Sequence, residues 1–182
     1  GEDRRIGVCW DLCHSAVVGE TPAEVARCLG ETGIPLGKVQ ISAALECRGG
    51  LDATRLGRLA ELASDPYLHQ VRGRLMDGRP FACSDLARLL KQPSVIEQVD
   101  EVRVHCHVPV HVDDFGDGLR GTAWRPGVET ALDAGCADFE LETYTLPVLP
   151  EAYGGRDHIG TMVDEMAACA RALDLSQESI SG

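Results

Sequence analysis

Residues 103–114 read Arg-Val-His-Cys-His-Val-Pro-Val-His-Val-Asp-Asp, and this stretch decides the fold that we expect from the sequence. Three of the chain's six histidines, His105, His107 and His111, stand at even spacings of two and four residues within it. Because strand side chains alternate between faces, this spacing puts the three imidazoles on one face of a strand. Imidazoles followed by two aspartates suit a divalent transition metal. An edge strand with solvated histidines is the alternative.

The composition indicates one folded domain that does not bind nucleic acid. The chain has 182 residues and is 44% hydrophobic, which suffices for one domain with a real core. The formal net charge is −12, with 29 acidic and 17 basic residues, and such a field repels phosphate backbones. No apolar run approaches the length of a membrane span, and no signal-like segment opens the chain. We therefore expect a cytoplasmic protein without a membrane span.

The eight cysteines include no Cys-x-x-Cys pair, and several fall inside apolar strand or helix patterns. Buried free thiols in a reducing compartment are therefore favoured over a disulfide scaffold. The spacing of Cys9, Cys13 and His14 leaves a zinc site open as an alternative.

Strand and helix patterns alternate four times along the chain, which predicts a parallel sheet with helices outside it. The strands are expected at 6–11, 37–42, 103–114 and 138–144, and the helices at 21–33, 52–62, 126–134 and 157–173. Thr21 with Glu24 forms a capping box, and Asp52 can cap the second helix. In the last helix, helical spacing predicts a core stripe of Ile159, Met162, Val163, Met166, Ala170 and Leu173.

Residues from about 67 to 92 are interpreted as an insertion that contains a β-hairpin. Arg72, Arg74 and Arg79 make it the one locally basic segment of the chain. Contact with an anionic substrate group is one interpretation of these arginines, and a solvated hairpin tip is the favoured one.

Four successive predicted strands carry polar groups on one face: Asp11, then Gln40 with Ser42, then His105 with His107, then Glu140 with Glu142. A closed parallel barrel would direct all of them to its C-terminal mouth. Burying carboxylates without a partner is costly, and a metal ion would offset that cost. A salt-bridge network is the alternative, but no basic residue lies inside the Glu-x-Glu strand, and the histidine strand has only Arg103 at its start.

The order of these motifs resembles that of the xylose-isomerase-like TIM barrels, the superfamily of sugar phosphate isomerases, epimerases and AP endonucleases. The motifs are Asp-x-x-His at 11–14, Gly-Lys-Val-Gln-Ile-Ser at 37–42, the histidine strand, and Glu-x-Glu at 140–142. Within that superfamily, three segments are similar to the EboE-type metabolite traffic proteins: Tyr-Leu-His-Gln-Val at 67–71, His-Cys-His-Val-Pro-Val-His at 105–111, and Glu-Leu-Glu-Thr-Tyr-Thr-Leu-Pro-Val-Leu-Pro at 140–150.

The resemblance implies an α/β fold, the C-terminal half of a (β/α)8 barrel in which parallel strands alternate with helices. Residues 1–175 would form this partial barrel, with the hairpin inserted at about 67–92, and residues 176–182 would be a polar tail. Half a barrel exposes strand edges, so we expect either self-association or an N-terminal half-barrel that completes it.

The resemblance also implies roles for individual residues. Asp11 matches the family's metal-binding aspartate, and Glu142 matches its metal-binding glutamate and acid/base. The family's metal-binding histidine is replaced by Gln40, so His107 or His105 is expected to take its place, with Glu140 as a further donor. His14 is the expected catalytic and substrate-contacting histidine. The other expected substrate-binding residues are Lys38, which equally fits a surface lysine, Gln40 and His69.

Three functions follow from these expectations. The first is an isomerase or epimerase that uses a divalent ion, Mn, Mg, Co or Zn, to move a proton next to the carbonyl of a sugar-like or sugar-phosphate substrate. The second is a metal-dependent hydrolase that uses the His-x-His pair at 105–107. The third is a metabolite-binding or trafficking protein without catalysis. In each case the partner is a small polyol or sugar-like molecule.

Overall fold

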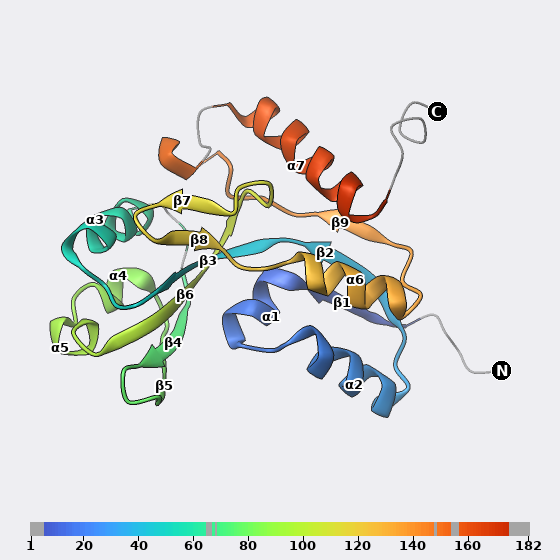
Figure 1. Ribbon diagram of the computed structural model, residues 1–182, viewed down its shortest axis with the longest axis horizontal. Helices are drawn as coiled ribbons and strands as arrows, with labels where there is room; N and C mark the ends of the chain where they lie inside the picture. Colours follow the sequence, from blue (N-terminus) through green and yellow to red (C-terminus); the bar gives the residue numbers. More distant parts are fainter. Residues whose placement is uncertain (1–5, 65–66, 68, 148, 154–156, 175–182) are drawn as a thin grey trace.

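Two β-sheets meet end to end in the protein (Figure 1). The structure is a computed structural model that describes residues 6–64, 67, 69–147, 149–153 and 157–174. The tail predicted at 176–182 lies outside the described residues. None of the helices within the described ranges combines the length and the apolar character needed to cross a membrane.

The smaller sheet has three parallel strands in the order β1-β2-β9. Its strands are β1 (Val8–Asp11), β2 (Leu36–Ile41) and β9 (Phe139–Leu141). Two helices lie in this half of the molecule, α2 (Pro22–Thr32) and α6 (Arg125–Asp133), and α1 (Leu12–Val18) packs against strands of both sheets.

The larger sheet is antiparallel, with six strands in the order β5-β4-β6-β3-β8-β7. Its strands are β3 (Ala43–Arg48), β4 (Val71–Leu75), β5 (Pro80–Cys83), β6 (Val99–Val108), β7 (Asp114–Gly116) and β8 (Leu119–Gly121). Beside it lie α3 (Ala53–Leu62), α4 (Leu86–Leu89) and α5 (Pro93–Ile96).

The prediction of half a parallel barrel is wrong. The histidine strand, β6, pairs antiparallel with both of its neighbours, β3 and β4. From Glu101 to Val108, charged and imidazole side chains alternate along β6 with valines and Cys106. That alternation is typical of an antiparallel sheet with one covered face, whereas a buried parallel strand is apolar almost throughout. The predicted hairpin does form, from β4 and β5, but β4 pairs with β6 and so belongs to the larger sheet.

A strand that the sequence reading missed joins the two sheets. β3 begins directly after Ser42, which is the single residue that separates it from β2. Figure 1 shows β2 and β3 running on from one sheet into the other. The chain therefore changes partners at Ser42, from parallel β1 and β9 to antiparallel β6 and β8. This junction positions the candidate site.

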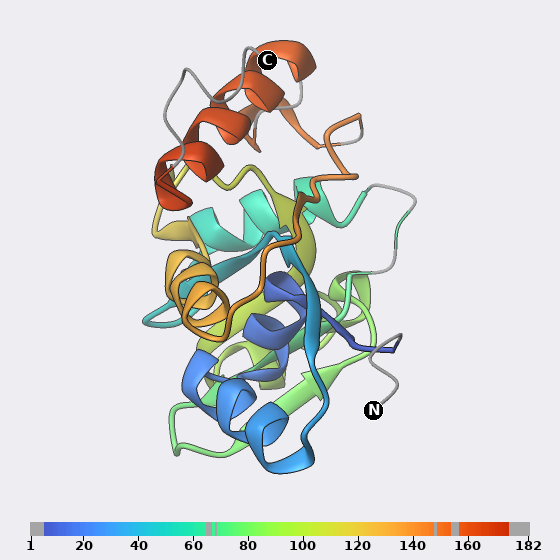
Figure 2. The same ribbon diagram turned by 90° about the vertical axis from the view of Figure 1, so that its right-hand side faces the viewer.

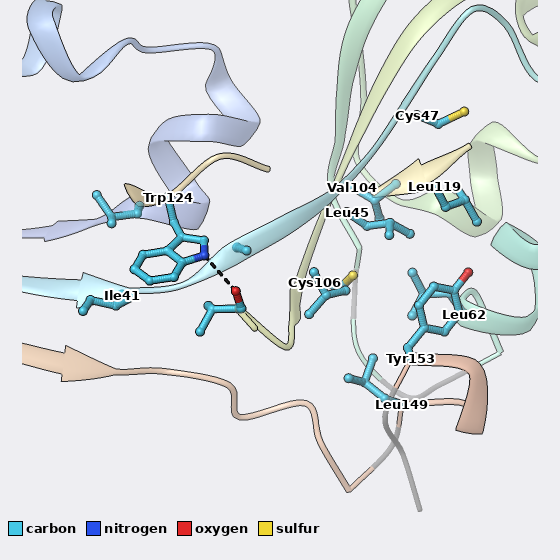
Figure 3. Close-up of a cluster of buried hydrophobic side chains, with 14 of the residues drawn as sticks. Ile41, Leu45, Cys47, Leu62, Val104, Cys106, Leu119, Trp124, Leu149 and Tyr153 are labelled. Atoms are coloured by element: carbon cyan, nitrogen blue, oxygen red, sulfur yellow. Dashed lines mark hydrogen bonds between the residues drawn. The ribbon is translucent and has the colours of Figure 1, made fainter. Parts of the chain in front are cut away.

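The hydrophobic core is shared by both sheets and the helices (Figure 3). Leu45, Val104 and Leu119 come from neighbouring strands of the larger sheet, and each is fully buried. Trp124, before α6, donates a hydrogen bond of 2.9 Å from its indole N–H to the carbonyl of Val110. The bond satisfies two buried polar groups at the end of the core that faces the smaller sheet.

The local helix signals in the sequence are confirmed. Thr21 and Glu24 form the reciprocal capping box of α2. Asp52 caps α3 by accepting a hydrogen bond of 2.9 Å from the N–H of Arg55. These signals act within one turn, so they do not depend on the tertiary fold.

The expected core stripe of α7 (His158–Ala172) is wrong for its first four residues, whereas Leu173 does pack against the core. Ile159, Met162, Val163 and Met166 are 78, 53, 61 and 56% exposed. The helix instead buries Glu165, whose Oε1 accepts hydrogen bonds from the N–H of Val110 at 3.0 Å and the hydroxyl of Thr143 at 2.6 Å. These two bonds fix the rotation of α7 and turn its apolar stripe outward. α7 and α2 lie on opposite sides of the molecule (Figures 1 and 2).

We expect Glu165→Gln to stabilise the protein at pH 8 by on the order of 1 kcal/mol, and to have a smaller effect at pH 4.5. Burial raises the pKa of Glu165 above its ordinary value. Between pH 4.5 and this raised pKa, Glu165 stays protonated in the folded state but not in the unfolded state. The free energy of unfolding therefore falls as the pH rises through that range. Glutamine keeps the acceptor oxygen and cannot ionise. Urea unfolding at both pH values measures the free energy of unfolding, and Glu129→Gln, at an exposed position, is the control. A difference between Glu165→Gln and the wild type that does not change with pH would contradict the prediction.

Candidate metal centre

The candidate site lies at the junction of the two sheets, where the three parallel strands end. Asp11 is the last residue of β1, and Ser42 and Glu142 follow β2 and β9 directly. β6 adds His105 and His107 from the larger sheet. The carboxyl ends of parallel strands are a common place for ligands, and in this protein an antiparallel strand supplies the imidazoles.

Asp11 holds the start of α1 and fixes His14. Its Oδ1 accepts hydrogen bonds from the N–H of His14 and the hydroxyl of Ser42, both at 2.9 Å. Its Oδ2 lies 2.7 Å from Nδ1 of His14. Burial acts to raise the pKa of Asp11, but the hydrogen bonds from His14, the nearby His107 and Ser42 outweigh burial and leave the pKa below its ordinary value. Asp11 is therefore a carboxylate whose position is fixed from two sides.

Five side chains form two overlapping groups of donors that could hold a metal ion. One group is Cys13, His105 and His107, and the other is Asp11, His14 and His107. Within each group the ligand atoms lie within 4.8 Å of one another. His107 belongs to both, and its Nε2 lies 4.0 Å from Oδ2 of Asp11.

The two imidazoles of β6 each present an unpartnered ring nitrogen to this space. Nδ1 of His107 lies 2.8 Å from the carbonyl oxygen of Glu142. A carbonyl only accepts, so Nδ1 carries the proton and Nε2 carries the lone pair. Nε2 of His107 and Nε2 of His105 are both buried without a hydrogen-bond partner among the described residues. Burial lowers the pKa of His107 and, with the charges of His14 and His107, lowers that of His105 to about 4.

Glu142 faces Asp11 and is the candidate acid/base. Burial, the charge of Asp11 and a hydrogen bond with its carboxylate raise the pKa of Glu142. Its Oε2 is buried and lacks a partner within the described part of the chain. Beside it, the ring of Tyr144 lies 4.6 Å from that of His107, and burial raises the pKa of Tyr144 to about 12. The pair of carboxyl groups can thus hold and transfer one proton.

A cleft of about 680 Å³ opens beside Asp11 and His14. Its walls come from β1, α1 and α2, and the apolar part includes Val8, Val18, Val25 and Leu29. The hydroxyl of Ser15 at the edge of the cleft already accepts a hydrogen bond from Trp10 and donates one to Glu20, both at 2.8 Å. The cleft gives a small molecule access to the outer donors of the site.

No family model, no curated protein and no solved structure matches this chain. Function is therefore inferred from the site itself. The donor atoms, their burial and the neighbouring carboxyl pair are the observations that bear on it.

The structure brings together five of the residues that the sequence singled out: Asp11, His14, His105, His107 and Glu142. The others belong to neither donor group. Glu140 is half exposed and forms an ion pair with Lys38, and it hydrogen-bonds Gln40. His69 is buried, with Nδ1 3.1 Å from the carbonyl oxygen of His105.

Two features of the site differ from the sequence reading. Cys13 joins His105 and His107, while Cys9, its expected zinc-binding partner, is exposed and lies outside the donor groups of the described residues. His111 follows the end of β6, and its Nε2 lies 4.0 Å from Asp164. The signal in the sequence for Cys13 as a metal donor is its position between Asp11 and His14 in Asp-Leu-Cys-His.

We expect zinc affinity to rise about tenfold per pH unit between pH 6 and 8. Burial and the charges of Asp11, Cys106 and Glu142 raise the pKa of the Cys13 thiol well above its ordinary value. The thiol must lose this proton to bind zinc, so higher pH favours the complex. Competition with a chromophoric chelator measures the affinity, and Cys13→Ser should flatten the slope. A wild-type affinity that levels off above about pH 7 would place the ion on imidazole and carboxylate donors alone.

Proposed function

We propose that the protein is a zinc-dependent hydrolase of small amides, with the ion held by Cys13, His105 and His107. The observation that supports this most is the pair of buried, unpartnered Nε2 atoms beside a buried thiol. One thiolate and two imidazoles suit Zn²⁺ better than Mg²⁺ or Mn²⁺. Three protein donors also leave one coordination position free, as catalytic zinc sites do.

When bound, the ion would supply a Lewis acid and lower the pKa of a water molecule at the free position. Glu142 takes the proton of the attacking water, as its raised pKa and unpartnered oxygen allow. The water oxygen bonds to the amide carbon, the C–N bond breaks, and Glu142 returns the proton to the leaving nitrogen. His14 is 59% exposed at the cleft and held by Asp11, so it can orient the substrate carbonyl.

An isomerase or epimerase acting on a sugar-like substrate is the second candidate. It is favoured by the hydrogen-bonded carboxyl pair of Asp11 and Glu142, which could move a proton to and from a carbon next to a carbonyl. Such chemistry needs no free position for water. The two candidates therefore differ in whether a water oxygen enters the product.

One experiment separates these functions. Apoprotein is loaded in parallel with Zn²⁺, Mn²⁺, Co²⁺ or Mg²⁺ and incubated in D₂O with a panel of primary amides and a panel of aldoses and ketoses. We expect zinc-dependent release of ammonia from an amide and no deuterium in the sugars. Deuterium next to the sugar carbonyl without ammonia release would support the isomerase instead. Stoichiometric metal without either reaction would overturn the catalytic proposal in favour of a binding protein.

A further inference from the structure

Three arginines and one glutamate line a pocket on the polar face of the larger sheet. Arg72 and Arg74 of β4 stand opposite Arg103 and Glu101 of β6 in the antiparallel register. Side chains two residues apart on a strand point to the same face of the sheet, and so do side chains of directly paired residues. These four side chains therefore lie on one face. They line a pocket of about 200 Å³ that the C-terminal end of α1, with Gly19, closes on one side.

The positive charge of this pocket is not balanced by the described residues. Glu101 forms an ion pair with Arg103 and lies 4.0 Å from Arg48. Arg72 and Arg74 donate only to backbone carbonyls, at 3.0 and 3.1 Å, and neither forms an ion pair within the described ranges. An unbalanced cluster of this kind stands out in a chain of net charge −12.

The strand register gives Arg103 a like charge on its β4 side, while on its β3 side it places Arg103 opposite Glu46, which pairs with Arg48. Arg72 lies directly opposite Arg103, and like charges at paired positions of neighbouring strands destabilise a sheet. Arg103 cannot turn away freely, because it also donates to the carbonyl of Ala16 at the end of α1. An anion between the guanidinium groups would convert this repulsion into two favourable contacts.

We propose that this pocket binds a tetrahedral oxyanion, the phosphate group of a small phosphomonoester or free phosphate. Guanidinium groups donate paired N–H groups that match phosphate oxygens. The pocket is small, which restricts the ligand to a compact anion. It shares no lining residue with the candidate metal centre, so its occupancy does not depend on the proposed hydrolase function.

The test uses metal-free full-length protein at constant ionic strength, with inorganic phosphate and glycerol phosphate as probes. We expect phosphate to raise the Tm of the wild type in a saturable way, whereas chloride does not. Arg72→Gln should weaken the response at least tenfold, and Arg74→Gln should weaken it as well. Arg79→Gln should respond like the wild type, because Arg79 lies outside the pocket and pairs with Asp77 in the same hairpin.

The Tm of Arg72→Gln relative to the wild type, measured without phosphate, gives a second readout. In phosphate-free buffer, Arg72→Gln should unfold at the same temperature as the wild type or higher, because the repulsion with Arg103 is gone. In saturating phosphate the order should reverse. A wild-type Tm that does not respond to phosphate, or an Arg72→Gln protein that responds as strongly as the wild type, would overturn the proposal. Tighter binding of glycerol phosphate than of phosphate would identify a phosphomonoester as the ligand.

Discussion

The His107→Ala protein is expected to bind Zn²⁺ at least about 100-fold more weakly than the wild type. Both donor groups of the site contain His107, so its removal leaves each group with two donors. The substitution also removes the hydrogen bond to the carbonyl of Glu142 that orients the ring. Chelator competition measures the affinity, and circular dichroism with thermal unfolding verifies that the variant is folded.

Two further variants locate the ion within the site. If Cys13, His105 and His107 hold it, His105→Ala should weaken binding almost as much as His107→Ala, and His14→Ala should weaken it little. His111→Ala is the matched control, because His111 belongs to neither donor group. Retention of wild-type affinity by His107→Ala would refute the metal centre. A strong loss in His14→Ala alone would shift the ion to the Asp11 side.

The sequence predicted local structure well and strand direction poorly. The capping residues Thr21 and Asp52 act within one turn, and both helices begin where they indicate. The direction of β6 depends on its partners β3 and β4, which pair with it across long separations in sequence. Polar and apolar residues alternate from Glu101 to Val108, a pattern typical of an antiparallel sheet, whereas the resemblance to a parallel barrel implied the other strand direction.

The candidate site shows the same division between local and distant effects. Asp11 and His14 are linked by the helix cap itself, so the Asp-x-x-His spacing alone brings them together. β9 ends at Leu141, which leaves Glu142 to turn toward the site while Glu140 stays on the sheet with Lys38. Likewise, the outward stripe of α7 depends on bonds from Glu165 to residues 55 and 22 positions away. No periodicity within a helix contains that information.

Glu142→Gln should lower kcat for the hydrolysed amide by roughly 10²–10⁴-fold while leaving the zinc content unchanged. Glutamine has the same shape but cannot accept the proton of the attacking water. Because burial and Asp11 raise the pKa of Glu142, the wild-type rate should rise with pH through that pKa, and the variant should lose this limb of the profile. Stopped assays of ammonia release from pH 5 to 8 measure both effects.

Glu140→Gln is the matched control for this prediction, because Glu140 lies two residues earlier on β9 and pairs with Lys38 at the surface. It should retain the wild-type rate and pH profile. The converse result, a loss of turnover in Glu140→Gln with normal turnover in Glu142→Gln, would exclude Glu142 as the base. Equal small losses in both variants would mean that the carboxylates act only through the general negative field, which a charged side chain at either position supplies.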